Sequence, residues 1–425
     1  MTAPLTLLLD GQKIGCIHRE KGRLSLVYED AWRARPDAYP LSLSMPLASA
    51  EHPHGPVEAF LWGLLPDSEA VIDRWARRFH VSPRNPFALV GAVGEDCAGA
   101  VQFVRPDRLD ALQAGATDDV AWLDEGGVAD RLRALREDHT AWRQARDTGQ
   151  FSLAGAQPKT ALIFTDGRWG VPSGRLPTTH ILKPPTGEFD GHAENEHFCM
   201  ILARRLGLPT ARSDVRTFGH EITIVIERYD RVLIGERIAR VHQEDFCQAL
   251  AQLPWKKYEN EGGPNVRACI DLLADQSSDP STDIATFVNA VLLNWIIAGT
   301  DAHAKNFSML IGGGGRARLA PLYDIASALP YDGLDFQKLK LAMKFGGEYR
   351  LRDIGARHVA RLAKDARLDP VKLAIHARDF AIQTGRMTAL VRIELHEAGL
   401  THPIIPRLAE AISARAQRLA KLLEA

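Results

Sequence analysis

Residues 294–306 read NWIIAGTDAHAKN, and this segment joins two different kinds of local sequence. Before it, apolar residues recur at helical spacing, which predicts a helix over 284–298 with one buried face. After it, short strand-like runs within 307–323 flank four consecutive glycines, which predicts a β-hairpin. The helix is expected to stop at Gly299, so Asp301 follows directly after its end.

Asp301 and Asn306 are separated by four residues, the D-x-x-x-x-N spacing of protein-kinase catalytic loops. In such a loop the carboxylate meets the attacking hydroxyl, while the amide oxygen holds a magnesium ion. The predicted hairpin strands, 307–311 and 318–322, return the chain to its starting point. Asp324 is therefore expected beside Asn306, as a second oxygen ligand for magnesium.

The β-rich half supplies candidate phosphate-binding groups. Lys183 ends a predicted strand and Glu196 lies in the helix predicted over 196–206, an order that matches the lysine–glutamate pair of kinases. The chain has neither a Walker motif nor a kinase G-x-G-x-x-G loop. The segment SLAGAQPK at 152–159 instead combines small residues, which let a backbone approach phosphates, with a serine and a lysine.

Composition narrows the class of protein. The 425 residues include 52 Lys and Arg and 53 Asp and Glu, and a net charge of −1 argues against a protein that coats polyanions. The five cysteines are scattered and form no C-x-x-C pair, which argues against a disulfide framework or a zinc ribbon. The longest apolar stretch, 288–299, is too short to span a bilayer. We therefore expect a cytoplasmic protein with no membrane partner.

The chain changes character along its length. The first 105 residues are predicted to be β-rich, with a helical insert over 57–80, and residues 106–147 form a polar connector with some helix. From about residue 242 the pattern is helical almost to the end, interrupted by one β-like island at 307–323.

The sequence resembles the HipA family of serine/threonine kinase toxins, which belong to type II toxin–antitoxin systems. The resemblance rests on motifs that occur in the family's order: YPLSLSMP (39–46), FLWGLLP (60–66), GEDCAG (94–99), SLAGAQPK (152–159), ILK (181–183), ERYDR (227–231), HQED (242–245), TDAHAKN (300–306) and YDI (323–325). Together they cover about residues 5–330.

The resemblance implies an α+β protein with a bilobal, protein-kinase-like fold. Residues 1–105 would form an extra β-rich subdomain, 106–230 the kinase-like N-terminal lobe, and 231–425 a mostly helical C-terminal lobe with the catalytic loop.

The resemblance also implies roles for individual residues. Asp301 would be the catalytic aspartate, Asn306 and Asp324 the magnesium ligands, and Lys183 the lysine for the α- and β-phosphates of ATP. Ser152 lies at the family's autophosphorylation position, where modification ejects the loop and inactivates the kinase. Further nucleotide contacts would come from the phosphate loop, the hinge and the catalytic loop: Ala154, Gly155, Ala156, Gln157, Lys159, Glu227, Tyr229, His303, Lys305 and Tyr323. Pro158 is a departure from this pattern, because proline has no amide hydrogen and cannot donate a hydrogen bond to a phosphate.

The expected activity is phosphorylation of protein serine or threonine with ATP and Mg²⁺. By resemblance, the protein substrate would be an aminoacyl-tRNA synthetase, and the partner a HipB-like helix-turn-helix antitoxin that carries most of the contact with operator DNA. Two other interpretations stay open. A small-molecule phosphotransferase of the aminoglycoside type is disfavoured, because Gly-Thr rather than His-Gly precedes Asp301. A catalytically silent nucleotide-binding partner of a DNA-binding antitoxin is disfavoured by the complete Asp-Asn-Asp-Lys set.

Overall fold

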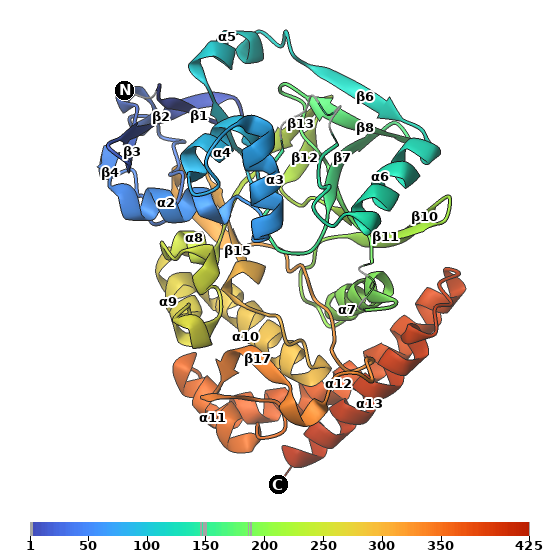
Figure 1. Cartoon of the computed structure of the whole chain (residues 1–425). Coiled ribbons are helices and arrows are strands. Elements are labelled where there is room, and N and C mark those ends of the chain that lie inside the picture. Colours follow the sequence, from blue (N-terminus) through green and yellow to red (C-terminus); the bar gives the residue numbers. More distant parts are fainter. Residues whose placement is uncertain (1–2, 145–146, 148–150, 186, 188, 425) are drawn as a thin grey trace. The chain divides into compact units, whose positions relative to one another are not determined.

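The structure is a computed structural model (Figure 1) that describes residues 3–144, 147, 151–185, 187 and 189–424. It divides into two compact units, each built from three stretches of the chain. Unit 1 comprises Met1–Pro184, Arg216–Trp255 and Ser308–Arg318. Unit 2 comprises Pro185–Val215, Lys256–Phe307 and Leu319–Ala425.

Unit 1 begins with a five-stranded antiparallel sheet in the order β4-β3-β2-β1-β5. Its strands are β1 (Leu5–Leu9), β2 (Gln12–Glu20), β3 (Arg23–Tyr28), β4 (Glu51–His52) and β5 (Val101–Val104), with the short helix α1 (Asp30–Arg33) between β3 and β4. Apolar side chains of the sheet share one core with the helices α2 (His54–Gly63), α3 (Glu69–Phe79) and α4 (Pro86–Val93). The helical insert predicted over 57–80 is thus two helices, and Pro66 between them bridges to Gly155.

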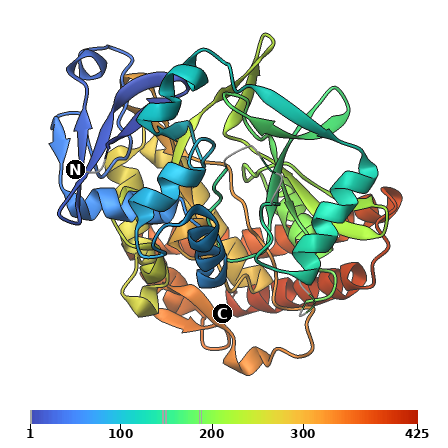
Figure 2. The same ribbon diagram turned by 45° about the horizontal axis from the view of Figure 1, so that its top comes forward.

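A second sheet of unit 1 has six strands in the order β10-β11-β9-β7-β8-β6. They are β6 (Asp119–Leu123), β7 (Thr160–Thr165), β8 (Arg168–Ser173), β9 (His180–Lys183), β10 (Ser213–Phe218) and β11 (Glu221–Glu227). The helix α5 (Pro106–Gln113) precedes β6, and α6 (Glu125–Glu137) lies along the sheet in both ribbon views (Figures 1 and 2). Val128 and Leu132 of α6 pack on Trp169 and Phe218 of the sheet.

The polar connector predicted over 106–147 therefore contains an unexpected strand, β6. Most side chains of β6 are exposed, because β6 is the outermost strand of its sheet and pairs with β8 on one side. An edge strand in contact with water carries little of the alternating apolar pattern by which strands are predicted.

The remaining β-structure of unit 1 includes a pairing that the sequence pattern did not predict. The hairpin of β12 (Arg231–Ile234) and β13 (Arg237–Arg240) is followed by a sheet in the order β14-β15-β16. Its strands are β14 (His242–Asp245), β15 (Ser308–Gly312) and β16 (Arg316–Leu319), and the short helix α8 (Phe246–Ala249) follows β14. Residues 242–245, predicted to begin a helical region, thus form a strand whose antiparallel partner lies more than sixty residues later.

The second strand of the glycine hairpin also begins and ends earlier than predicted. The glycines form a 3-10 turn, η4 (Gly313–Gly315), so β16 starts at Arg316. Leu322, predicted to end this strand, instead makes an isolated parallel bridge with Thr210. Its N–H donates to the carbonyl of Pro209 at 2.8 Å, and its carbonyl accepts from Ala211 at 2.9 Å.

Unit 2 is mainly helical. Its helices are α7 (His192–Arg205), α9 (Val266–Gln276), α10 (Pro280–Ile297), α11 (Ala356–Asp365), α12 (Pro370–Glu397) and α13 (Ile404–Leu422), and it includes the small hairpin β17 (Lys340–Phe345) and β18 (Glu348–Arg350). α12 and α13 run side by side in both ribbon views (Figures 1 and 2). The α+β class is confirmed, although the C-terminal half holds more β-structure than the single predicted island.

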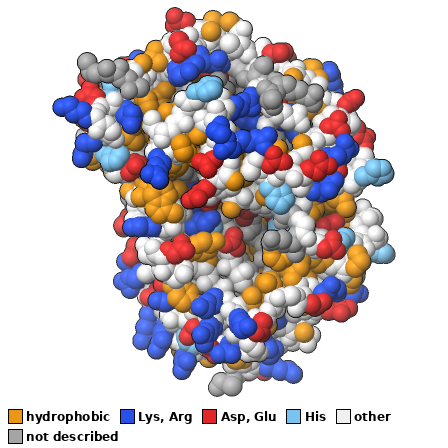
Figure 3. All heavy atoms as spheres, viewed as in Figure 1, with side chains coloured by type: hydrophobic (Ala, Val, Ile, Leu, Met, Phe, Trp, Pro, Cys, Tyr) orange, Lys and Arg blue, Asp and Glu red, His pale blue; other side chains and the backbone are white. Residues whose placement is uncertain are grey.

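The described residues contain no helix that combines the length and the apolar composition needed to cross a bilayer. On the face drawn in Figure 3, basic and acidic side chains are interspersed.

Candidate functional site

The end of α10 determines where Asp301 lies. Asp279 caps the start of this helix and Pro280 occupies its first turn. At the other end, Ala298 adopts a left-handed conformation (φ 53°), and its N–H donates to the carbonyl of Asn294. A Cβ on Gly299 would lie 2.1 Å from Asn294 Oδ1, so a larger residue there would have to displace the Asn294 side chain. The predicted stop at 298–299 is confirmed.

The loop after α10 folds onto the backbone of Asp301. The carbonyl of Asp301 accepts the N–H of His303 at 2.8 Å and Asn306 Nδ2 at 2.8 Å. The Asp301 side chain is 70% exposed, whereas His303 is buried. The two residues of the D-x-x-x-x-N spacing are therefore brought together, with the carboxylate of Asp301 open to solvent and the Asn306 amide nitrogen turned toward the loop.

The Asp301 carboxylate has a neighbour that sequence reasoning missed. Tyr258 Oη donates to Asp301 Oδ1 at 2.7 Å, and the Tyr258 ring meets the His303 ring edge to face, with centroids 5.0 Å apart. His303 Nε2 lies 3.9 Å from the same carboxylate oxygen. Tyr258 precedes Asp301 by 43 positions and lies outside any regular helix or strand, so no periodicity or spacing in the sequence indicates the contact.

The chain returns to this loop at Tyr323. Tyr323 Oη donates to the carbonyl of Lys305 at 2.9 Å, which joins the residues just before and just after the predicted hairpin. The next residue, Asp324, is half-buried and has a left-handed backbone (φ 54°), a conformation that aspartate tolerates better than most residues. The two segments are thus in contact at Lys305 and Tyr323, and the expected position of Asp324 beside Asn306 stays a prediction.

Buried hydrogen bonds anchor the segment after Asp324 to two helices of unit 2. Ser327 exchanges hydrogen bonds with Asn195 of α7, at 2.8 and 3.0 Å, and Ser327 Oγ donates to the carbonyl of Ile297 in α10. Glu196, next to Asn195, is 1% exposed within α7, a helix that starts four residues earlier than predicted. Lys183 belongs to unit 1, so its predicted pairing with Glu196 stays a prediction.

The candidate nucleotide residues of unit 1 lie on its six-stranded sheet and beyond it. Lys183 is the last residue of β9, opposite Ile224 of β11, and is buried. Glu227 ends β11 with its side chain exposed. Tyr229 donates its hydroxyl to Gln243 Oε1, and burial raises the pKa of the Tyr229 phenol.

The segment 152–159 is packed within unit 1. Ser152 is fully buried, its Oγ donates to the carbonyl of Leu64 at 2.7 Å, and its N–H donates to that of Asp96 at 2.9 Å. Lys159 Nζ donates to the carbonyl of Ala154 at 2.7 Å. Gly155 has a φ of +100°, a backbone conformation that favours glycine in this turn.

The ERYDR motif (227–231) is largely structural. Arg228 bonds Asp230 at 2.9 Å, and Arg231 bonds Asp96 of the GEDCAG motif at 2.9 Å, with Arg240 on the same carboxylate at 3.2 Å. All these side chains are buried. Burial alone would raise the pKa of Asp96, but the arginines outweigh it and hold that pKa at about 2. Two distant motifs therefore meet in one charged cluster.

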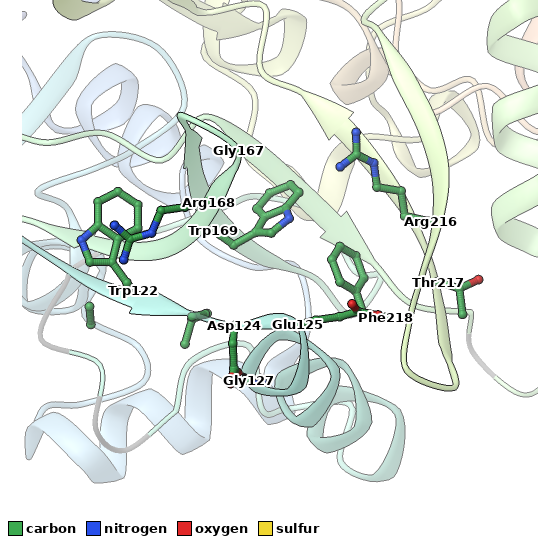
Figure 4. A pocket seen from close by; sticks show the side chains of 12 residues that line it. Trp122, Asp124, Glu125, Gly127, Gly167, Arg168, Trp169, Arg216, Thr217 and Phe218 are labelled. Carbon is green, nitrogen blue, oxygen red and sulfur yellow. Dashed lines mark hydrogen bonds between the residues drawn. The ribbon is translucent and has the colours of Figure 1, made fainter.

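A hollow of about 1080 Å³ in unit 1 involves none of the predicted site residues (Figure 4). Figure 4 shows it between the start of α6 and the aromatic side chains of the six-stranded sheet. The Arg168 guanidinium lies over the Trp122 ring at 4.3 Å, and the Arg216 guanidinium lies 5.9 Å from the Trp169 ring centroid. Asp124 at the rim caps α6 by accepting the Gly127 N–H.

Two protein-family models match this chain, one in its N-terminal part and one over its middle and much of its C-terminal part. The model of the HipA-like C-terminal domain matches residues 151–388, and the model of the HipA N-terminal domain matches residues 5–104. The chain is 34% identical over 419 residues to the Y4mE protein of Sinorhizobium fredii, covering 97% of each. It is 30% identical over 351 residues to the serine/threonine-protein kinase toxin HipA of Shewanella oneidensis, covering 78% of this chain and 76% of that one.

A solved structure is similar over nearly the whole length. A chain in the complex of HipA, HipB and operator DNA from the Shewanella oneidensis MR-1 toxin–antitoxin system superposes with a TM-score of 0.83. The sequence identity is 26%, and the match covers 99% of this chain and 98% of that one.

Proposed function

This chain belongs to the HipA family of serine/threonine kinases, and from that membership we propose that it acts as the toxin of a toxin–antitoxin pair. It would transfer the γ-phosphoryl group of ATP to a serine or threonine of a protein. The observation that carries the proposal is the Asp301 loop, whose backbone is held by His303 and Asn306 while the carboxylate stays 70% exposed.

Asp301 would accept the proton of the target hydroxyl. Its exposure allows a side chain of another protein to reach it, and its fixed backbone limits the positions that the carboxylate can take. Lys183 would contact the α- and β-phosphates, with Ala154–Lys159 and Lys305 supporting the triphosphate and with Glu227 and Tyr229 contacting the adenine.

Asn306 and Asp324 would hold the magnesium ion. Because Asn306 Nδ2 donates to the Asp301 carbonyl, its Oδ1 is the amide atom turned away from the loop, which suits a ligand for a hard cation. When bound, magnesium would neutralise charge on the phosphates. Among the described residues no group of three or more His, Cys, Asp or Glu side chains could hold a metal ion, so protein ligands beyond Asn306 and Asp324 are not part of the proposal.

The partner and target are proposed by kinship. The Shewanella structure holds HipA together with HipB and operator DNA, and this supports a HipB-like helix-turn-helix antitoxin for the present chain. A net charge of −1 offers little general attraction to DNA, so contact with the operator would come mainly from the antitoxin. We propose an aminoacyl-tRNA synthetase as the protein substrate, with inhibition of translation as the result.

Phosphorylation of Ser152 would switch the kinase off. In the structure Ser152 Oγ is buried against the carbonyl of Leu64, with no room in that contact for a group of charge about −1.5 to −2. Burying such a charge beside a carbonyl oxygen is strongly unfavourable. A phosphate on Ser152 would therefore displace residues 152–159, which include Lys159, from their place in unit 1.

The proposal is tested with labelled ATP. Purified protein is incubated with γ-labelled ATP, Mg²⁺ and a cell lysate, and labelled proteins are identified by mass spectrometry. Asp301→Asn should bind ATP normally and reduce labelling by roughly 10²–10⁴-fold, the usual value of general-base catalysis. The matched control is Asp332→Asn, a change of an exposed aspartate in the same unit.

The outcomes separate the three interpretations. Labelled protein that disappears with Asp301→Asn supports the kinase. Near-wild-type labelling by Asp301→Asn contradicts the role of Asp301. Label found only in small molecules would support a small-molecule phosphotransferase, and ATP binding without any transfer would support a silent nucleotide-binding protein.

A further inference from the structure

Tyr258 contacts the carboxylate that the proposed reaction uses. Its hydroxyl donates to Asp301 Oδ1 at 2.7 Å, a short distance typical of a hydroxyl bonded to a carboxylate. Both residues belong to unit 2. Oδ2 of Asp301 accepts no hydrogen bond from any residue that the structure describes, so the two oxygens of this carboxylate are in different environments.

The segment that carries Tyr258 is itself fixed. The carbonyl of Tyr258 accepts the N–H groups of Glu261 and Gly263, both at 3.0 Å. A Cβ on Gly263 would lie 2.0 Å from the carbonyl oxygen of Lys256, so this closed turn requires glycine at that position. The turn is therefore a compact support that offers the Tyr258 backbone little freedom.

An adjacent side chain ties the turn to a strand. Glu259 Oε2 accepts the N–H of Lys344 in β17 at 2.6 Å, and Glu259 Oε1 lies 3.6 Å from Lys344 Nζ. On the other side, the Tyr258 ring lies against the buried His303 ring. Tyr258 is thus held by its backbone, by its sequence neighbour and by its ring, and its hydroxyl meets a carboxylate that is otherwise exposed.

We propose that Tyr258 is a positioning residue for phosphoryl transfer: its hydroxyl fixes the Asp301 carboxylate through Oδ1 so that Oδ2 faces the target hydroxyl. This inference rests on the proposed role of Asp301. An exposed aspartate side chain rotates freely, and each unproductive rotamer lowers the fraction of encounters in which the base can take the proton. One short hydrogen bond to the carboxylate removes much of that freedom without occupying the second oxygen.

The opposite role makes a different prediction. If the Tyr258 hydroxyl occupied the place of the target hydroxyl, it would have to leave before reaction, and its removal would speed transfer. The two roles therefore differ in the sign of the effect on kcat.

The experiment measures kcat and both KM values for Tyr258→Phe with ATP and an identified protein substrate. This change keeps the ring against His303 and removes only the hydroxyl. We expect kcat to fall by roughly 10- to 100-fold, the scale of a misplacement of up to 1 Å, with KM for ATP unchanged. Tyr349→Phe is the matched control, because no hydrogen bond of the Tyr349 hydroxyl to a described residue is present.

A double variant separates positioning from general damage. If Tyr258 acts through Asp301, adding Tyr258→Phe to Asp301→Asn should cause no further loss of transfer. A multiplicative loss in the double variant, or a rise of kcat in the single variant, would overturn the proposal. Wild-type kcat for Tyr258→Phe would overturn it as well.

A second change keeps the test decisive if Tyr258→Phe impairs folding. Glu259→Ala leaves the Tyr258 hydroxyl in the protein but releases the turn from Lys344, and it should lower kcat in the wild-type background and not in Asp301→Asn. Loss in both backgrounds would refute positioning. Failure of the proposed function itself is recognised separately, since it would appear as full activity of Asp301→Asn alone.

Discussion

Glu244 is a buried acid whose removal should stabilise the protein above neutral pH. It belongs to β14, is 1% exposed, and accepts the N–H of Leu43 through Oε1 at 2.7 Å. Burial raises the pKa of Glu244 from 4.5 to about 8, although the Leu43 N–H and the Ser42 hydroxyl near the carboxyl group oppose the shift. Glu244→Gln keeps the shape and the acceptor for Leu43 but cannot ionise.

The direction of the pH effect follows from proton counts. Below about pH 4.5 the acid is protonated in both the folded and the unfolded chain, so it adds no pH dependence. Between about pH 4.5 and 8 the unfolded chain loses this proton while the folded chain keeps it, and the free energy of unfolding falls as the pH rises. Above about pH 8 both states are ionised and the effect is constant.

The size of the effect follows from the same two values. A change of one pKa unit corresponds to about 1.4 kcal/mol, so the wild type should lose roughly 3 kcal/mol relative to Glu244→Gln between about pH 5 and pH 8. For a unit of this size that difference corresponds to a change of about 10 °C in the unfolding midpoint.

The assay compares unfolding midpoints of wild type and Glu244→Gln across this pH range. The variant should gain on the wild type steadily as the pH rises, and Glu236→Gln, a change of an exposed glutamate in the same unit, should not. A constant difference between wild type and Glu244→Gln over the whole range would refute the reasoning, because it would mean that Glu244 ionises alike in both states.

Four further predictions concern the site and its support. Asp324→Ala should weaken magnesium-dependent ATP binding, since it removes a proposed metal ligand, and calorimetric titration with Mg-ATP would contradict this if the affinity were unchanged at saturating magnesium. Ser152 should carry phosphate after expression with active enzyme and none with Asp301→Asn, as read by mass spectrometry; phosphate in both samples would point to another kinase. Ser152→Asp should be weakly active in the labelling assay, because a carboxylate cannot replace the buried hydroxyl beside Leu64. Asp96→Asn should lower the free energy of unfolding by about 3–5 kcal/mol, measured by urea denaturation, because it leaves buried arginines without their shared carboxylate, and a loss below about 1 kcal/mol would contradict that.

Elements with a local cause could be predicted from the sequence. The hairpin of β7 and β8 forms around Thr165-Asp-Gly167, where turn chemistry and alternating strands act within a dozen residues. The buried face of α10 follows from helical spacing, and its end before Asp301 follows from the helix-stop signal of a glycine at 299. The spacing of Asp301 and Asn306 predicted that both belong to one loop, because so few residues separate them.

Contacts between distant parts of the chain could not be predicted in this way. β14 lacks a local strand signal and forms because β15 supplies its hydrogen-bonding partner. The Asp96 cluster draws Arg231 and Arg240 from two strands more than 130 positions away, and burial of these side chains makes their pairing necessary.

The motifs of the sequence were sufficient to place the chain in its family and to predict an aspartate directly after a helix as the centre of the chemistry. What holds that aspartate was decided by tertiary structure alone. Tyr258 reaches Asp301 through a turn closed by Gly263 and fastened by Glu259 to β17. A hydrogen bond depends on the distance between two atoms and not on the number of residues between them, so no spacing along the chain records it.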